Sequence, residues 1–273
     1  MRTSEIQAYE ALSAYYESHN EDARFDARHN SVEFLTTLDY IGRYLRPGDR
    51  ICEIGAGSGR YSHALAQRGH HVDAVELIPR NIELFRQRTE PGEDVTIREG
   101  SATDLSCFRD GMFDMTLLLG PMYHLFTEEE QRRALSEAIR ITRPGGLLYV
   151  SYCMNEGTVV RFGFLGHNIL PCLESGKIDP VSFQCFSDPE DLFVLWRRET
   201  IFARTAGLPV SRLHFVGTDM FTNYFREAVD AMSEEEFAAW LAYHRAICER
   251  EDLVGLTFHA LDILKKEAET RSC

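Results

Sequence analysis

Short apolar runs alternate with stretches of helical periodicity between about residues 31 and 152. The first periodic stretch places Val32, Leu38 and Ile41 on one helical face, and Pro47 ends it. Strands that alternate with helices connect through right-handed crossovers, so the pattern predicts a parallel sheet with helices on both faces. The predicted strands are 50–54, 71–75, 95–99, 113–119 and 147–152, and the helices between them are 60–68, a helix from 79, and 127–141 with a Thr127–Glu130 capping box.

The pattern is less regular from residue 153 onward. Loop signals dominate up to Cys185, and Ser187 with Glu190 suggests a capping box that leads into helical residues up to Gly207. Residues 209–216 suggest a strand, Ser233 with Glu236 begins a helix, and 257–264 alternates like a final strand, although a helix fits it nearly as well. We interpret 153–190 and 218–253 as insertions that form a lid, and not as an independent domain.

Composition places the 273 residues among ordinary globular proteins, with 44% hydrophobic and 26% charged residues. A chain of this size buries roughly 73% of its surface on folding, so it can form a hydrophobic core without disulfides or structural metal ions. The formal net charge of −14 repels phosphate backbones and anionic lipids. It therefore disfavours nucleic-acid and membrane partners, although the local basic pair Arg197–Arg198 means that a nucleic-acid substrate is not fully excluded.

The cysteines and histidines predict no metal site. The seven cysteines include no C-x-x-C pair, and neither a disulfide framework nor a zinc ribbon is indicated. His70 and His71 would point to opposite faces of a strand, and His244 lies on an apolar helical face. Residues 1–30 lack the apolar core of a signal peptide, and no apolar run reaches the ~20 residues of a spanning helix. We therefore expect a cytoplasmic protein.

A glycine-rich stretch follows the first predicted strand. Residues 51–59 read Ile-Cys-Glu-Ile-Gly-Ala-Gly-Ser-Gly, and glycines let a backbone turn tightly and approach a ligand closely. Glu76 ends the second strand 17 residues after Gly59, where a carboxylate can accept both hydroxyls of a ribose. Alone, the loop could be a plain tight turn and Glu76 a solvated carboxylate. Together they indicate an adenosine-containing ligand.

The spacing of the glycines separates two such ligands. Dinucleotide folds prefer G-x-G-x-x-G, whereas this chain has G-x-G-x-G with Glu53 just before it. A carboxylate there would repel a diphosphate, but it suits a ligand with an α-amino group and a sulfonium. The loop therefore favours S-adenosylmethionine over NAD.

With these residues in view, the chain resembles the class I, Rossmann-like S-adenosylmethionine-dependent methyltransferases, in their broad type 11 small-molecule group. The resemblance covers 50–152 in the expected order, and two flanking segments, 20–25 and 152–155, look like one uncharacterised bacterial subgroup. The matching motifs are 53–62, 74–77, 100–105, 113–125 and 143–146.

The resemblance implies a three-layer sandwich around a mostly parallel seven-stranded sheet in the class I order, with the last strand antiparallel and helical lid insertions. It implies a cofactor-covering segment at 1–30, the S-adenosylmethionine-binding core at 31–152, and completion of the sheet at 153–273.

The resemblance also assigns roles around the methionine and ribose of the cofactor. Glu53 would help hold the ammonium group, Glu76 would bind the ribose hydroxyls, and Leu77 would pack on the adenine. The loop residues expected to line the methionine part are Gly55, Ala56 and Gly57, with Gly59 completing the loop.

Further expected contacts lie after the third and fourth strands. Ala102 would offer its backbone N–H to the adenine, and Ser101, where the family often has Asp or Asn, or else Asp104 would accept from the adenine amino group. Leu119 and Gly120 would lie beside the sulfonium. From the N-terminal segment, either Arg24 or Tyr16 would fold over the cofactor and meet its carboxylate.

The implied reaction is an in-line displacement of the activated methyl group, with S-adenosylhomocysteine as product, toward a small-molecule acceptor. Positioning supplies most of the catalysis, and a base is needed only where the acceptor must lose a proton. His124 is the candidate base and Tyr123 could orient the acceptor or the cofactor, although His124 could instead only hold the loop after Pro121. A non-catalytic S-adenosylmethionine sensor or scaffold, and less so a NAD-dependent oxidoreductase, are the alternatives. The motifs specify neither the acceptor nor the oligomeric state.

Overall fold

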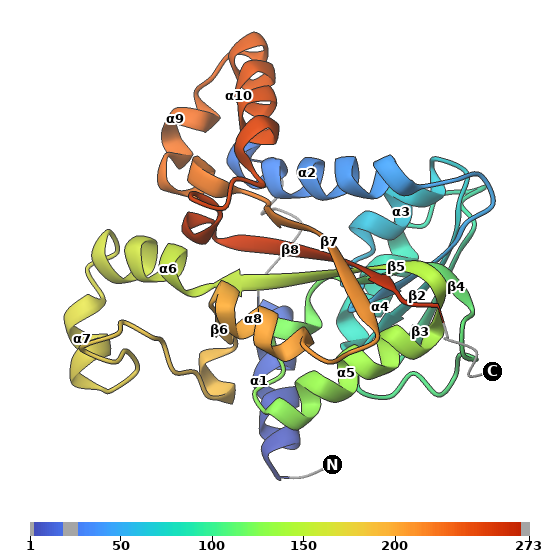
Figure 1. Ribbon diagram of the computed structural model, residues 1–273, viewed down its shortest axis with the longest axis horizontal. Coiled ribbons are helices and arrows are strands. Elements are labelled where there is room, and N and C mark those ends of the chain that lie inside the picture. The colour runs from blue at the N-terminus through green and yellow to red at the C-terminus, as the bar shows by residue number, and fades with distance from the viewer. Residues whose placement is uncertain (1–2, 19–26, 269–273) are drawn as a thin grey trace.

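A single mixed sheet forms the centre of the computed structural model, which describes residues 3–18 and 27–268 (Figure 1). The strands lie in the order β3-β2-β1-β4-β5-β8-β7, and only the pairings of β8 with β5 and β7 are antiparallel. The predicted class I order and antiparallel last strand are therefore confirmed. The strands are β1 (Arg50–Ile54), β2 (His71–Glu76), β3 (Val95–Glu99), β4 (Phe113–Leu118), β5 (Thr142–Met154), β7 (Val210–Gly217), β8 (His259–Lys266) and a short eighth strand, β6 (Leu195–Trp196), that pairs with β5.

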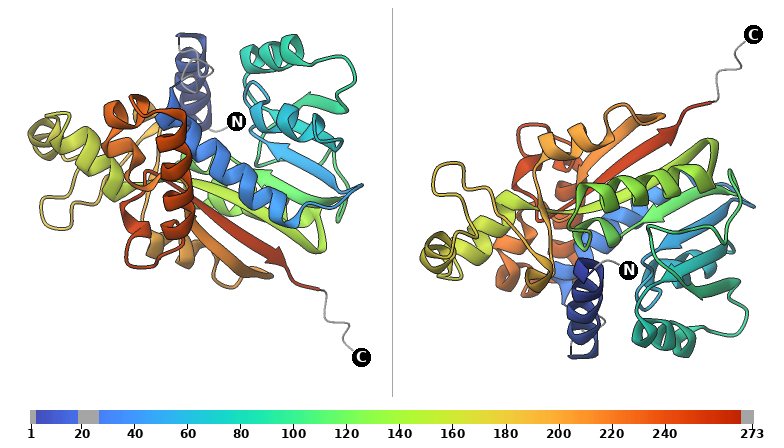
Figure 2. Two further views of the ribbon diagram at one scale, coloured as in Figure 1. Left: turned by 90° about the horizontal axis from the view of Figure 1, so that it is seen from above. Right: turned by 90° about the horizontal axis from the view of Figure 1, so that it is seen from below.

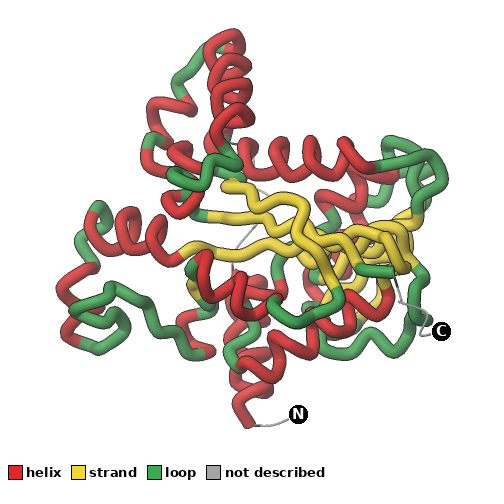
Figure 3. Tube along the Cα trace, in the orientation of Figure 1, coloured by secondary structure: helices red, strands yellow, loops and turns green. Residues whose placement is uncertain are grey.

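Helices cover both faces of this sheet (Figure 3). Side chains alternate along β1, so Ile51 packs into one core with helices α2 and α3, while Ile54 packs into the other with α5 and α8. The main helices are α1 (Thr3–Ser18), α2 (Arg28–Tyr44), α3 (Arg60–Ala66), α4 (Pro79–Arg88), α5 (Glu128–Ile141), α8 (Arg198–Thr205) and α10 (Glu234–Ile247). Shorter ones are α6 (Asn155–Thr158), α7 (Ile169–Glu174) and α9 (Arg226–Asp230). Across the described residues, no helix is long and apolar enough to cross a membrane.

Local sequence signals explain where two of these helices begin. Thr127 and Glu130 form a reciprocal capping box on α5, and Ser233 and Glu236 form one on α10. Each pair satisfies two backbone N–H groups that a helix start leaves without partners.

The capping box predicted at Ser187 and Glu190 is wrong. The side chain of Asp188 accepts from the backbone N–H of Glu190, and the side chain of Asp191 accepts from the backbone N–H of Asp188, so the two cap a single 3₁₀ turn, Pro189–Asp191. Leu192 then takes a positive φ of 67°, which ends the turn before a helix can form. The loop prediction up to Cys185 also missed helical turns at 159–164 and in α7.

The two segments interpreted as a lid lie in different places. The middle of the segment 153–190, which contains α6 and α7, projects from the end of β5, and the chain then returns to the body, where the turn Pro189–Asp191 contacts α1 (Figures 1 and 2). Helices α9 and α10 instead stand beside the N-terminal end of α2: a 2.7 Å hydrogen bond joins His29 to Asp230 of α9, and an ion pair joins Arg28 to Glu234 of α10.

Candidate functional site

A cavity of about 570 Å³ lies where β1, β2, β3 and β4 end, and α1 runs along it. The carboxyl edge of a parallel sheet is the usual place for a ligand in such folds. Helix α1 contributes Ala8, Tyr9, Leu12 and Tyr16 to the wall, at the spacing of one helical face. The size of the cavity suits a small molecule.

Most of the residues predicted from sequence line this one cavity. Gly59 is absent from the cavity wall, and Arg24 lies outside the described residues. The predicted residues that line it are Tyr16, Glu53, Gly55, Ala56, Gly57, Glu76, Leu77, Ser101, Ala102, Asp104, Leu119, Gly120, Tyr123 and His124.

Two of the three glycines of the loop, Gly55 and Gly59, meet their neighbours too closely for any side chain. Gly55 has a φ of 73°, and a Cβ there would lie 2.7 Å from the ring of Pro121 in the loop after β4. Gly59 begins α3 with a φ of 87°, and a Cβ there would lie 2.4 Å from Phe85. Gly59 thus packs α3 against α4 and does not face the cavity.

Glu76 holds this loop in place. Its Oε2 accepts from the N–H of Gly57 at 2.8 Å, and its Oε1 accepts from the N–H of Ile78 at 2.8 Å and the amide of Asn81 at 3.4 Å. Burial raises the pKa of Glu76, and these donors oppose the rise. The carboxylate therefore shapes the cavity as well as lining it.

Glu53 is almost fully buried at the end of β1, with 1% of its surface exposed. Burial raises the pKa of Glu53 to about 7, although the hydroxyl of Ser62 donates a hydrogen bond that opposes the rise. Near neutral pH this carboxyl is thus divided between its neutral and charged forms.

At the other end of the cavity, the two candidates for the adenine contact lie side by side. The Ser101 hydroxyl accepts from the Thr103 N–H at 3.2 Å, and Asp104 accepts from the Ser106 N–H at 3.1 Å. The hydrogen bond from Ser106 lowers the pKa of Asp104, which is exposed. Both side chains reach the cavity, so the geometry leaves both as candidates.

His124 sits in a group of aromatic rings at the opposite wall. Its Nδ1 donates to the carbonyl of Leu192 at 2.8 Å, and its Nε2 faces the hydroxyl of Tyr16 at 3.5 Å. Burial lowers the pKa of His124 to about 4, so the ring is neutral at pH 7 and Nε2 keeps its lone pair. Rings of Tyr123 and Phe193 lie 4.9 and 5.2 Å from the imidazole.

Several functional groups of this wall were not found from the sequence. Leu192 and Phe193 lie 68 and 69 positions after His124, in a segment without periodicity, so no local signal joins them to it. Glu33 and Thr37 line the cavity from α2, and their spacing of four on one helix was the available signal. Of the described residues in 153–190 and 218–253, Thr218 alone reaches the cavity; the lid role of those segments stays a prediction.

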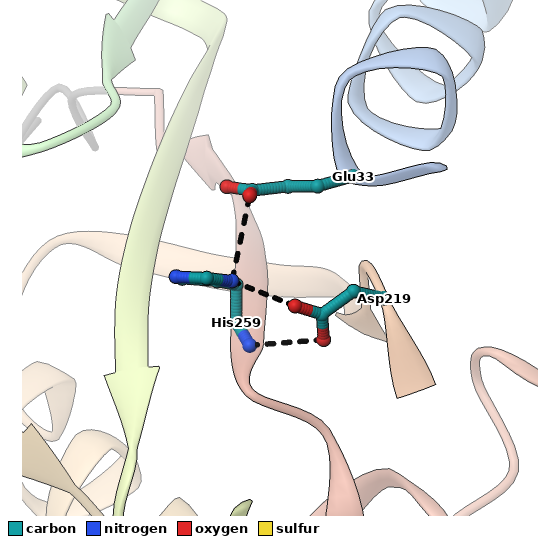
Figure 4. A group of neighbouring side chains, drawn as sticks. All are labelled: Glu33, Asp219 and His259. Atoms are coloured by element: carbon teal, nitrogen blue, oxygen red, sulfur yellow. Dashed lines mark hydrogen bonds and ion pairs between the residues drawn. The ribbon is translucent and has the colours of Figure 1, made fainter. Parts of the chain in front are cut away.

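A second cluster joins Glu33 to Asp219 and His259 (Figure 4). His259 Nδ1 donates to Asp219 Oδ2 at 2.7 Å and lies 3.4 Å from Glu33 Oε2. Asp219 Oδ1 also accepts from the hydroxyl of Thr257 and from the backbone N–H groups of Phe258 and His259. A cavity of about 220 Å³ lies beside the cluster, and Glu33 lines both cavities.

Charge explains why this cluster is stable in a buried place. Burial alone would lower the pKa of His259, but the charges of Glu33 and Asp219 raise it well above its usual value. Burial would likewise raise the pKa of Asp219, but His259 and the other donors lower it. The three ligand atoms lie within 4.8 Å of one another, close enough to hold a metal ion, and the contacts of His259 Nδ1 also fit a protonated imidazole between two carboxylates.

The fold defines a Rossmann-like protein with a cavity of small-molecule size at its strand ends, and comparison with known proteins narrows this class. Residues 52–150 match the family model of a methyltransferase domain. The ubiquinone biosynthesis O-methyltransferase of Aromatoleum aromaticum is 27% identical over 203 residues, which cover 72% of this chain and 84% of that enzyme. The demethylmenaquinone methyltransferase of Clavibacter sepedonicus is 34% identical over 103 residues, 38% of this chain and 40% of that protein.

Solved structures agree in fold. The N-methyltransferase NodS of Bradyrhizobium japonicum, solved with S-adenosylhomocysteine, superposes with a TM-score of 0.59 at 13% identity, covering 96% of this chain and all of that one. A methyltransferase of Thermotoga maritima gives 0.57 at 19% identity, with 96% and 100% covered. The chain is a class I S-adenosylmethionine-dependent methyltransferase.

Proposed function

We propose that this enzyme methylates a hydroxyl oxygen of a small organic acceptor, bound between α1 and the loop after β4. The observation that carries the proposal is the state of His124: a neutral imidazole whose Nε2 lone pair faces the cavity wall beside Tyr16. A hydroxyl must lose its proton as it is methylated, and such a group can take it. The O-methyltransferase activity in the name of the relative from Aromatoleum aromaticum supports the same acceptor atom.

The residues present fit the cofactor. The loop after β1 brings Gly55, Ala56 and Gly57 to the cavity wall, and Glu53 and Glu76 line the cavity beside it as acceptors. We assign the methionine part to Gly55, Ala56 and Gly57, with Glu53 toward its ammonium group. The remaining assignments are Glu76 to the ribose, Leu77, Ser101 and Ala102 to the adenine, and Leu119 and Gly120 to the sulfonium, with Tyr16 over the cofactor.

S-adenosylmethionine supplies a methyl group on a sulfonium, which is a good leaving group. His124 Nε2 receives the hydroxyl proton, while the carbonyl of Leu192 holds the Nδ1–H and so stabilises the imidazolium that forms. Tyr123, whose ring lies against His124, orients the acceptor. Helix α1 forms one wall of the cavity. Alignment of the acceptor with the methyl group inside this cavity lowers the barrier.

The net charge of the chain and its free cysteines bear on the class of acceptor and on the cellular compartment. The net charge of −14 disfavours nucleic-acid substrates, which supports a small molecule. Six cysteines of the described chain are free thiols, which supports work in the reducing cytoplasm.

A methyl-transfer assay with labelled S-adenosylmethionine tests the proposal over a panel of phenols, catechols, aliphatic hydroxy compounds and amines. We expect a hydroxyl compound to be methylated, and His124→Ala to lower its kcat by about 10²–10⁴-fold. Calorimetry should give the variant nearly unchanged affinity for S-adenosylhomocysteine. Methylation of amines alone, or a normal kcat in the variant, would contradict the proposed acceptor atom and base while leaving the methyltransferase class intact.

A further inference from the structure

Residues 155–188 form a projecting segment, here called the apolar arm. The arm leaves the sheet at the end of β5, contains α6, a π-helical turn at 159–164 and α7, and returns toward β6 (Figures 1 and 2). None of its residues lines the large cavity or the smaller one beside His259. Its shape therefore has to be explained by something other than the site described above.

The arm turns its large apolar side chains outward. Seven of its large apolar side chains are exposed, from 36% at Phe183 to 87% at Val181, and α7 buries none of its residues. The rings of Phe164 and Phe183 lie 6.4 Å apart, so residues far apart along the arm share one surface. The seven are Phe162, Phe164, Leu165, Leu170, Val181, Phe183 and Phe186.

Polar contacts hold the base of the arm in this conformation. Asn155 donates to the carbonyl of Phe183 at 3.0 Å and accepts from the N–H of Cys185 at 2.8 Å. Arg197, outside the arm, pairs with Glu156 at 2.6 Å and donates to the carbonyl of Ser182 at 2.7 Å. The buried side chain of Asn155 and the partly exposed pair Arg197–Glu156 thus fix the backbone, while most of the large apolar side chains face outward, which is unusual for a folded segment.

One stretch of the arm carries no charged side chain, although the arm as a whole contains two Lys or Arg and four Asp or Glu residues. Residues 162–173 contain no Asp, Glu, Lys or Arg, whereas the chain carries a formal net charge of −14. Two copies of so acidic a protein repel each other over most of their surface. The uncharged stretch is a surface on which two copies can meet without that cost.

We propose that the apolar arm is the interface of a homodimer. Aromatic side chains bury about 150–250 Å² each when covered, so the exposed part of these seven residues amounts to roughly 700 Å². A stable interface of standard size needs about 800 Å² from each partner. Two-fold symmetry places the same apolar surface on both sides, so the patch is its own complement, and patches of this size on soluble proteins mark interaction sites.

Analytical ultracentrifugation of the full chain, from nanomolar to high micromolar concentration, tests the proposal. The wild type should sediment as a dimer that dissociates on dilution. Each of Leu170→Asp and Phe186→Asp should raise the dissociation constant by about 100-fold or more, because a two-fold axis places the new charge in the interface twice. Phe225→Asp is the matched control: Phe225 is 57% exposed, Phe186 is 56% exposed, and Phe225 lies outside the arm. Its dimer should persist.

Calorimetry with S-adenosylhomocysteine shows that each variant is folded, because the cofactor cavity shares no residue with the arm. A wild type that stays monomeric at every concentration would overturn the proposal, as would a dimer that survives both arm substitutions. A monomer that binds phosphatidylcholine vesicles and loses that binding in Leu170→Asp would assign the arm to a bilayer surface, and so overturn the dimer.

Discussion

The parallel half of the sheet and the apolar arm use their side chains in opposite ways. Between β1 and β5 the strands bury apolar residues on both faces, and polar groups such as Glu53 and Glu76 gather at the strand ends, where they shape a cavity. In the arm, Asn155 is buried together with Val159 and Ile178, while seven large apolar residues face outward. One region is built to enclose a ligand, and we infer that the other is built to be covered.

The largest effect that separates the two regions should come from paired glycine substitutions. Gly59 and Gly176 both have positive φ, at 87° and 73°, but a Cβ at Gly59 would lie 2.4 Å from Phe85 and one at Gly176 would meet nothing within 4 Å. We expect Gly59→Ala to lower the free energy of unfolding by about 2–4 kcal/mol, from strain and overpacking together. Gly176→Ala should lower it by about 1 kcal/mol, from strain alone.

Urea denaturation of both variants measures these free energies. Equal losses of unfolding free energy in the two variants would mean that the loop after β1 accommodates a Cβ as easily as the arm does. The contrast between an enclosed and an open region would then be wrong.

The next effect concerns the buried ion pair that ties α2 to the antiparallel strands. His259 has a raised pKa, so its contribution to stability is fully present below about pH 6.5 and is lost as pH rises through the folded-state pKa. His259→Gln should lower the free energy of unfolding by about 3 kcal/mol near pH 6, because it leaves Asp219 and Glu33 without their charged partner. The difference from wild type should shrink as pH rises.

Thermal unfolding from acid to alkaline pH follows this difference, with His71→Gln as control. His71 also pairs with two carboxylates, Asp73 and Asp94, but its side chain is 31% exposed, so its loss should cost under about 1 kcal/mol. A pH-independent difference for His259→Gln would show that the imidazole only fills space.

The smallest effect is a proton released at Glu53. Its pKa of about 7 leaves it partly protonated at neutral pH, and an ammonium group beside it would favour the charged form. Cofactor binding at pH 7 should therefore release up to about half a proton, measured by calorimetry in buffers of different ionisation enthalpy. Glu53→Gln should bind without this release. A wild type that releases none would move the ammonium contact to another group.

The parallel half of the fold followed from the sequence, because its signals are local. Apolar runs, a glycine-rich loop and capping boxes such as Thr127–Glu130 each act within a few residues. The same holds for the part of the cavity made by strand ends, since parallel strands bring their carboxyl ends together at one edge.

The rest depends on partners far apart in the chain. The carbonyl of Leu192 binds His124 from 68 positions away, and the side chain of Asn155 binds the N–H of Cys185 from 30 positions away. No periodic pattern in the sequence predicts either hydrogen bond. Ser187 and Glu190 had the right spacing for a cap, but Asp188 beside Pro189 competed for the same turn. Side-chain exposure in the arm was equally hidden, because an apolar run reads the same whether it faces inward or outward.

The 3.5 Å approach of the Tyr16 hydroxyl to His124 Nε2 has a consequence for the order of events at this site. A single lone pair cannot serve the phenol and an incoming hydroxyl at once, so an entering substrate must compete with Tyr16 for the imidazole. The ring of Tyr15, the neighbour of Tyr16 on α1, packs against the ring of Phe193. Phe193 directly follows Leu192, whose carbonyl accepts from His124 Nδ1. On the base role that we propose for His124, admission of the substrate and release of that base are thus one event, and an empty site keeps the base occupied.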